Sequence, residues 1–342
     1  MLSRRYFLRS SAIAVAGFGA APSWLLNAAA QGQGRRKILI SIFQRGAADG
    51  LNIVVPYFEK AYYDLRPGIA VPAPGKTNGA IDLDGRFGLH PSLQQLKPLW
   101  DAGNLAIVEA AGSPDPTRSH FDAQDYMESG TPGRTTADGW LNRALLFREA
   151  GSSPVRAIAM GAQLPRTLRG KHAAVAINNL EQFQVRNSNA AGILESMYAA
   201  TSDAALKNSG KETFEAVKII ESLNRSQMGG SLAAFSRDMG DRMADIVMVT
   251  MSEFGRTAKE DGNAGTDHGH GNLMMVLGGP VRGGKIYGRW PGLQPDQLYE
   301  QRDLAVTTDF RDVLGELIRA HYGQNNTAAF PGHEASPPLG LL

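Results

Sequence analysis

Two apolar runs that enclose a polar, glycine-rich loop constrain the fold of this chain more than any other stretch. Residues 246–251 are all apolar or β-branched, and residues 273–277 form a second apolar run. Short continuous runs of this kind are typical of strands buried in the core of a sheet. Because ligands bind at the carboxyl ends of strands in open α/β sheets, the loop between the runs is a candidate functional site.

The ionisable side chains of this loop belong to types that bind metal ions or transfer protons. Glu253, Asp267, His268 and His270 supply oxygen and nitrogen donors, and the neighbouring glycines let the backbone approach an ion. The alternative is a loop whose Asp and His side chains only cap turns. The gathering of several ionisable groups at one expected strand end favours a functional site.

Two other stretches place polar residues after expected strands. Asp49 lies in a glycine-rich turn after the apolar run 38–43, although Asp-Gly also occurs in ordinary turns. Ser119 and His120 fall in the first turn of an expected helix at 118–128, where free backbone N–H groups favour an anion. A hydroxyl there suits a nucleophile towards phosphate or sulfate, and the alternative is a helix cap.

Apolar runs and helical patterns roughly alternate along the chain, as a sheet covered by helices requires. Further strands are expected at 105–111, 155–160 and 173–177, and further helices at 90–100, 139–150, 231–243 and 309–322. One interval breaks the alternation, because helical patterns at 212–223 and 231–243 follow each other without a strand between them. A helix hairpin and a missing strand both explain this.

The N-terminal residues have the pattern of an export signal. Residues 3–8 resemble the twin-arginine export motif, and a short apolar stretch at 12–26, interrupted by glycines and Pro22, precedes three alanines at 28–30. This stretch is too short and too interrupted for a membrane anchor. We expect a signal peptide at 1–30, the twin-arginine export machinery as a partner, and a periplasmic or secreted protein without a permanent membrane anchor.

Composition excludes several other classes of protein. The net charge of +2 is too small to indicate nucleic-acid binding, and the absence of cysteine excludes disulfides and thiolate metal ligands. Any metal ion must therefore be bound by His, Asp, Glu or a hydroxyl. No repeat or low-complexity linker divides residues 31–342, which we expect to form one domain.

Several motifs together resemble a known family. They are RGAADG at 45–50, RSHF at 118–121, SEFGRT at 252–257, GTDHGHG at 265–271 and TTDFR at 307–311. With the export signal, they resemble the secreted family of domain of unknown function 1501 over nearly the whole chain after the signal. That family looks like a branch of the alkaline phosphatase, sulfatase and phosphoglycerate mutase superfamily. The resemblance implies an alkaline phosphatase-like α/β fold, with a central, mostly parallel sheet and helices on both faces.

The resemblance also implies a hydrolytic site with one or two divalent metal ions (zinc, manganese or calcium) beside a nucleophile. Phe254 occupies the position of a superfamily histidine and cannot bind metal. Ser119 would be the nucleophile, with Thr117 as second choice and His120 as a further catalytic residue. The metal ligands would be Asp49, Glu253, Asp267, His268 and His270.

This sequence departs from the family at one place. Family members usually carry a strand ending in Gly-Trp-Asp-Thr-His before the helix that matches 231–243, and this chain has no such motif. We therefore expect that a segment near 224–230 has been lost, at the point where the strand is missing. Too few donors then remain for two metal ions, and we expect at most one.

Two functions follow from this reading. The first is an exported metal-dependent hydrolase of phosphate or sulfate esters that acts on a small anionic substrate. The second is a non-catalytic secreted binding or assembly protein that retains the fold. A redox protein is disfavoured, because no G-x-G-x-x-G sequence follows the first expected strand.

Overall fold

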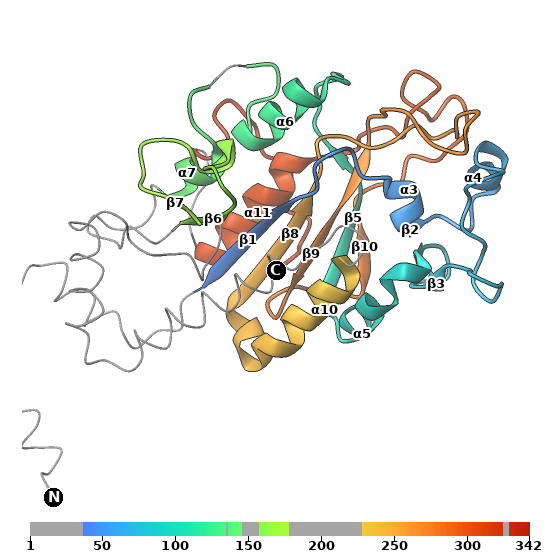
Figure 1. Ribbon diagram of the computed structural model, residues 1–342, viewed down its shortest axis with the longest axis horizontal. Coiled ribbons are helices and arrows are strands. Elements are labelled where there is room, and N and C mark those ends of the chain that lie inside the picture. Colours follow the sequence, from blue (N-terminus) through green and yellow to red (C-terminus); the bar gives the residue numbers. More distant parts are fainter. Residues whose placement is uncertain (1–36, 135, 146–156, 178–227, 324–327) are drawn as a thin grey trace, which may run out of the picture.

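A mixed six-stranded sheet forms the centre of the chain (Figure 1). The computed structural model describes residues 37–134, 136–145, 157–177, 228–323 and 328–342. The strand order is β1-β8-β9-β5-β10, and β11 also pairs with β5. The strands are β1 (Ile38–Phe43), β8 (Ile246–Met251), β9 (Asn272–Gly278), β5 (Leu105–Gly112), β10 (Lys285–Tyr287) and β11 (Thr308–Asp309).

The prediction of a mostly parallel sheet is wrong, because β9 runs against both of its neighbours. β1 pairs with β8 in parallel, and so do β10 and β11 with β5, whereas β9 is antiparallel to β8 and to β5. The loop at 252–271 causes this reversal, since β9 starts from the edge at which β8 ends. The strands β1, β8 and β5 still share one direction, so their carboxyl ends lie at the same edge.

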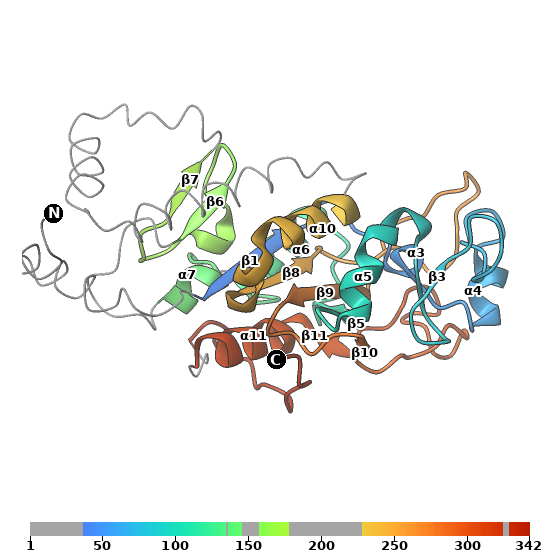
Figure 2. The same ribbon diagram turned by 90° about the horizontal axis from the view of Figure 1, so that it is seen from below.

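Helices cover both faces of the sheet, as predicted, because side chains alternate along each strand. Val247 and Val249 of β8 pack with residues of α6 (His120–Ser129), α7 (Trp140–Ala144) and α11 (Phe310–Tyr322). Ile246 and Met248 pack on the opposite face with η1 (Pro91–Leu96), α5 (Lys97–Asp101) and α10 (Met228–Met239). Figure 2 shows α10 and α5 on one side of the sheet and α11 on the other.

Several local predictions are confirmed. The helix expected at 118–128 is α6, and Gly130 ends it in the left-handed region with a φ of 67°. The helix expected at 90–100 is a 3₁₀ helix, η1, continued by α5. The helix expected at 231–243 is α10 followed by the 3₁₀ helix η5 (Gly240–Asp245), and the strand at 246–251 is β8.

Smaller elements flank the central sheet. β6 (Ile158–Met160) and β7 (Val175–Ile177) form a separate two-stranded sheet, with the 3₁₀ helix η3 (Arg166–Leu168) between them in sequence. The stretch between β1 and η1 carries the short helices α3 (Gly50–Ile53) and α4 (Lys60–Leu65). It also carries a three-stranded sheet of β2 (Val54–Val55), β4 (Gly88–Leu89) and β3 (Ile81–Asp82).

Three predictions concern residues outside the described ranges. The signal peptide at 1–30, the helix at 212–223 and most of the expected deletion point at 224–230 all lie there. In the ranges that are described, no helix has both the length and the apolar character that crossing a membrane requires.

Three glycines of the 252–271 loop, Gly255, Gly269 and Gly271, lie where backbone segments touch. A Cβ added to Gly255 would lie 1.9 Å from the carbonyl oxygen of Gly271, and one added to Gly269 would lie 2.3 Å from the carbonyl carbon of Arg256. The amide of Gly255 donates to the carbonyl of His270, and the amide of Gly269 donates to the carbonyl of Gly255. These backbone contacts explain the glycines of the motif without a bound ligand.

We expect the Gly255→Ala substitution to lower the free energy of unfolding by at least about 2 kcal/mol, because the added Cβ forces two backbone segments apart. Urea denaturation measures this change. Gly262→Ala in the same loop is the control: a Cβ there meets nothing within 4 Å, and we expect a change within about 0.5 kcal/mol. Equal stability of the two variants would contradict the role given to the backbone contact.

Candidate functional site

The candidate site lies where β1 and β8 end, because the loops after these strands are tied together. The amide of Gly46 donates to Oε1 of Glu253 at 2.7 Å, and the amide of Ala48 donates to the hydroxyl of Ser252 at 3.0 Å. In return, Nη2 of Arg256 donates to the carbonyl of Gly46 at 2.8 Å. These bonds hold the glycine-rich turn after β1 against the start of the 252–271 loop.

The carboxylate of Glu253 is fully buried and accepts several hydrogen bonds. Besides the amide of Gly46, its Oε1 faces Nδ1 of His120 at 2.8 Å and Nε2 of Gln124 at 3.1 Å. Burial raises the pKa of Glu253, but the hydrogen bonds from its own backbone, Gly46, His120 and Gln124 outweigh burial and lower the pKa to about 2. Glu253 is therefore ionised at neutral pH, and Nδ1 of His120 is the donor in their contact.

Two histidines face each other in front of Glu253. Nε2 of His120, on the first turn of α6, lies 2.8 Å from Nε2 of His268, which comes from the 252–271 loop. On the far side, Nδ1 of His268 lies 2.7 Å from Oδ1 of Asp267. Hydrogen bonds from the backbone and the ring of His268 lower the pKa of Asp267. The result is a continuous hydrogen-bonded chain, Glu253–His120–His268–Asp267.

This chain fixes where the protons are. Each Nδ1 donates its proton to an ionised carboxylate, so neither Nδ1 has a lone pair to offer. Two Nε2 lone pairs at 2.8 Å would repel each other, whereas one proton between them makes a hydrogen bond of ordinary length.

Phe254 forms an apolar wall beside the histidine pair. Its ring centroid lies 4.8 Å from that of His120 and 5.4 Å from that of His268. The side chains of His120 and His268 remain 34% and 38% exposed, so a reactant can approach the rings from another side. Phe254 therefore packs against the two imidazoles and supplies no ligand atom.

Asp49 is engaged elsewhere. Its Oδ2 accepts a hydrogen bond of 2.8 Å from Nη1 of Arg66, a fully buried guanidinium that also donates to the carbonyls of Thr257 and Ala258. Oδ1 of Asp49 is buried without a hydrogen-bond partner among the described residues. Asp49 thus neutralises a buried cation, and a metal ion placed on it would meet that positive charge.

Two further predicted residues lie next to the chain without joining it. His270 is buried and packs on Tyr299, with ring centroids 4.5 Å apart. Burial lowers the pKa of His270 despite the opposing charge of Asp303. Ser119 caps α6, because its hydroxyl accepts from the amide of Asp122 at 3.4 Å. The cap alternative is thus observed, and the role of Ser119 as a nucleophile remains a proposal.

The described residues do not fit the five-ligand metal site. Among them, no group of three or more His, Asp or Glu side chains is arranged to hold a metal ion. Asp49 is bound to Arg66, and the carboxylates of Glu253 and Asp267 are bound to ring nitrogens. Only two imidazole nitrogens converge, whereas catalytic zinc sites have three protein ligands.

Sequence reasoning missed the amide and the arginines that support the site. Gln124 donates to Glu253, and its own Oε1 accepts from Arg45. At the other end of the chain, Nη2 of Arg302 donates to Oδ2 of Asp267 at 3.1 Å. Helical spacing could have indicated Gln124, which lies four residues after His120 and therefore on the same face of α6. No comparable local signal points to Arg302.

The low pKa of Glu253 predicts a pH-dependent contribution to stability. Because the pKa falls from 4.5 in the unfolded chain to about 2, the contribution is present above pH 4.5 and is lost as the pH falls through 2. We expect the stability difference between the wild type and Glu253→Gln to shrink by about 3 kcal/mol over this window. Urea denaturation at a series of pH values measures it, and a difference that does not vary with pH would contradict the assignment.

Metal content tests the ligand prediction directly. Since only two nitrogen donors converge, we expect at most one divalent ion per chain after purification of the full-length protein without chelators. Elemental analysis by mass spectrometry provides the measurement. Two equivalents of zinc or manganese per chain would show that other residues supply the missing ligands.

Comparison with known families gives one match. A family described as a protein of unknown function (DUF1501) matches residues 219–328. The matched stretch spans β8, the whole 252–271 loop and all of α11, and so contains three members of the hydrogen-bonded chain. No curated protein and no solved structure gives a significant match. The match covers the SEFGRT, GTDHGHG and TTDFR motifs, so this part of the chain is similar to the DUF1501 family.

Proposed function

We propose that this protein is an exported hydrolase of phosphate or sulfate esters that uses the His120–His268 pair for proton transfer. One observation carries the proposal: the two Nε2 atoms lie 2.8 Å apart, and each ring has an ionised carboxylate on its Nδ1. A carboxylate in that position fixes the orientation of an imidazole and raises the basicity of its other nitrogen. The pair is thus suited to hold a proton and to release it.

The proposed reaction includes two proton transfers, one to the leaving oxygen and one from the attacking water. The proton held between the two Nε2 atoms passes to the leaving oxygen as the P–O or S–O ester bond breaks. The neutral pair then accepts a proton from the water whose oxygen has formed the new bond. The products are an alcohol and inorganic phosphate or sulfate, and the pair returns to its starting state. No step in this scheme uses a metal ion.

Ser119 is the proposed nucleophile if the reaction passes through a covalent intermediate. It directly precedes His120 and opens α6, a ten-residue helix whose first N–H groups favour a negatively charged group. Attack by the hydroxyl would transfer the phosphoryl or sulfuryl group to Ser119, and its proton would pass to the pair. Water would then release the group and restore the hydroxyl.

The superfamily relationship and the export route belong to the same proposal. Helices on both faces of the sheet and a site at the ends of β1 and β8 agree with an alkaline phosphatase-like arrangement. The Arg4-Arg5 pair and the alanines at 28–30 support export by the twin-arginine machinery to the periplasm or beyond.

A non-catalytic binding or assembly role is the second candidate. The observations in its favour are the engagement of Asp49 by Arg66 and the occupation of a ligand position by Phe254. Both remove donors on which the superfamily depends. The polar loop would then serve for binding, with its glycines retained for backbone contacts.

We expect the full-length protein to hydrolyse 4-nitrophenyl phosphate or 4-nitrophenyl sulfate, and His268→Ala to lower kcat by about a hundredfold or more. The reason is that His120 then has no partner with which to hold the transferable proton. His172→Gln is the matched control, because that histidine lies outside the hydrogen-bonded chain. Release of 4-nitrophenol measures the rate, and Ser119→Ala separates attack by serine from attack by water.

Two results would count against the hydrolase. One is equal activity of His268→Ala and the wild type. The other is a folded wild-type protein that hydrolyses neither ester, which would favour the binding or assembly role.

A further inference from the structure

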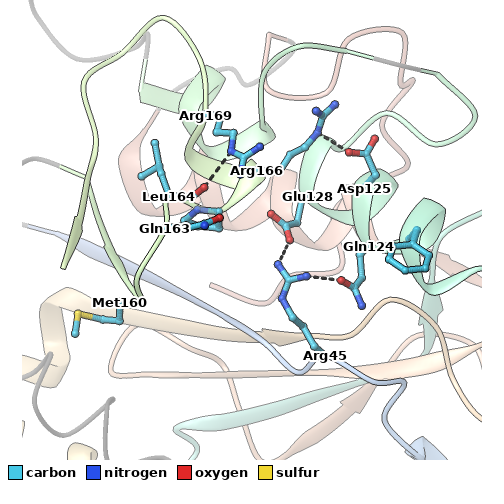
Figure 3. A pocket seen from close by; sticks show the side chains of 11 residues that line it. Arg45, Gln124, Asp125, Glu128, Met160, Gln163, Leu164, Arg166 and Arg169 are labelled. Atoms are coloured by element: carbon cyan, nitrogen blue, oxygen red, sulfur yellow. Dashed lines mark hydrogen bonds and ion pairs between the residues drawn. The ribbon is translucent and has the colours of Figure 1, made fainter. Parts of the chain in front are cut away.

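A cavity of about 440 Å³ lies beside α6, and neither His120 nor His268 lines it (Figure 3). Residues of α6 line one wall, and residues of the segment 160–169 line the other. Arg45, from the turn after β1, reaches between them. His120 faces Glu253, and Asp125 and Glu128 face the cavity. Gln124 takes part in both, because it donates to Glu253 and also lines the cavity.

Two of the three arginines in the cavity are paired with its two carboxylates. Arg45 forms an ion pair with Glu128, and Nε of Arg166 lies 2.7 Å from Oδ1 of Asp125. Glu128 is further held by the amide and the hydroxyl of Thr167. These pairs cancel one another's charges and hold the walls in place, as the dashed contacts in Figure 3 show.

Arg169 is the cation in excess. Its Nε donates to the carbonyl of Leu164 at 3.0 Å, and in the part of the chain that is described no carboxylate forms an ion pair with it. Since a guanidinium has five N–H donors, most of its donors remain for a ligand. The lining thus has one more positive charge than negative charge, and that charge is on an exposed side chain.

The same cavity has an apolar part. Phe121 lines it and is 89% exposed, far more than the 37% of Phe58, the other exposed large hydrophobic side chain among the described residues. Met160, Leu164 and Pro165 add apolar surface to the lining. Because this exposed aromatic ring and the cation of Arg169 line the same cavity, the cavity offers a surface for an anionic ligand with an apolar or aromatic portion.

We propose that this cavity binds an anionic group, a carboxylate, phosphate or sulfate, that is attached to an aromatic or apolar portion. Arg169 would bind the anion, and Phe121 would pack on the apolar portion. Neither residue belongs to the Glu253–His120–His268–Asp267 chain, so this binding site is distinct from the proposed hydrolytic one, although Gln124 contacts both. It therefore holds whether or not the protein is a hydrolase.

Three aryl anions that cannot be hydrolysed as esters test the proposal: benzoate, phenylphosphonate and benzenesulfonate. Isothermal titration calorimetry of the full-length protein at low salt gives their affinities. Inorganic phosphate and benzyl alcohol, which carry only one of the two features, should bind more weakly. The tightest of the three anions identifies the class of acidic group that the cavity prefers.

We expect Arg169→Gln to weaken binding of the preferred anion by about tenfold or more, and Phe121→Ala by several-fold. Both side chains are exposed, so neither substitution threatens the fold. Arg289→Gln removes an exposed arginine that does not line the cavity, and it should leave the affinity unchanged. His268→Ala should also leave it unchanged, since it alters only the hydrolytic site.

Four results would overturn the proposal. The first is that no aryl anion binds measurably, and the second is that Arg169→Gln keeps the wild-type affinity. The third is that Arg289→Gln loses as much affinity as Arg169→Gln, and the fourth is that only His268→Ala loses affinity. The third would indicate non-specific attraction to surface charge. The fourth would place the probe at the histidine pair.

Discussion

The buried, ionised carboxylate of Glu253 is the constraint on which this end of the molecule depends. A carboxylate removed from water is costly unless donors surround it. Here the donors come from separate parts of the chain: the amide of Gly46 from the turn after β1, and the side chains of His120 and Gln124 from α6. Movement of that turn or of α6 away from β8 would leave the buried charge with fewer partners. The carboxylate therefore holds the three elements together.

The same carboxylate gives the site its chemical character. Since Glu253 accepts from Nδ1 of His120, it turns Nε2 of that ring towards His268, and Asp267 holds His268 in the matching orientation. A structural requirement, the solvation of one charge, thus produces a pair of imidazoles that share a proton. Phe254 provides an apolar surface beside the pair. This arrangement supports the role in proton transfer that is proposed for the pair.

The other polar groups of this edge are divided into separate sets. Asp49 balances the buried Arg66, and Arg118 donates to the buried Asp303 at 2.7 Å. Arg45 joins Gln124 to Glu128 and so connects the cavity beside α6 with the histidine pair. Each set neutralises its own buried charges, which low-dielectric surroundings require. Arg169 differs from these arginines, because among the described residues no carboxylate forms an ion pair with it.

The sequence by itself determined the local elements. The apolar run at 246–251, the start of α6 near Ser119 and its end at Gly130 follow from side-chain pattern and backbone preference, which act over a few residues. It also placed Glu253, Asp267 and His268 in one loop. Only the tertiary structure decided the direction of β9, because that depends on how the 252–271 loop folds back. It likewise decided that Asp49 pairs with Arg66 and that His120 meets His268. Such choices among partners depend on distances between segments far apart in sequence, and neither composition nor spacing contains those distances.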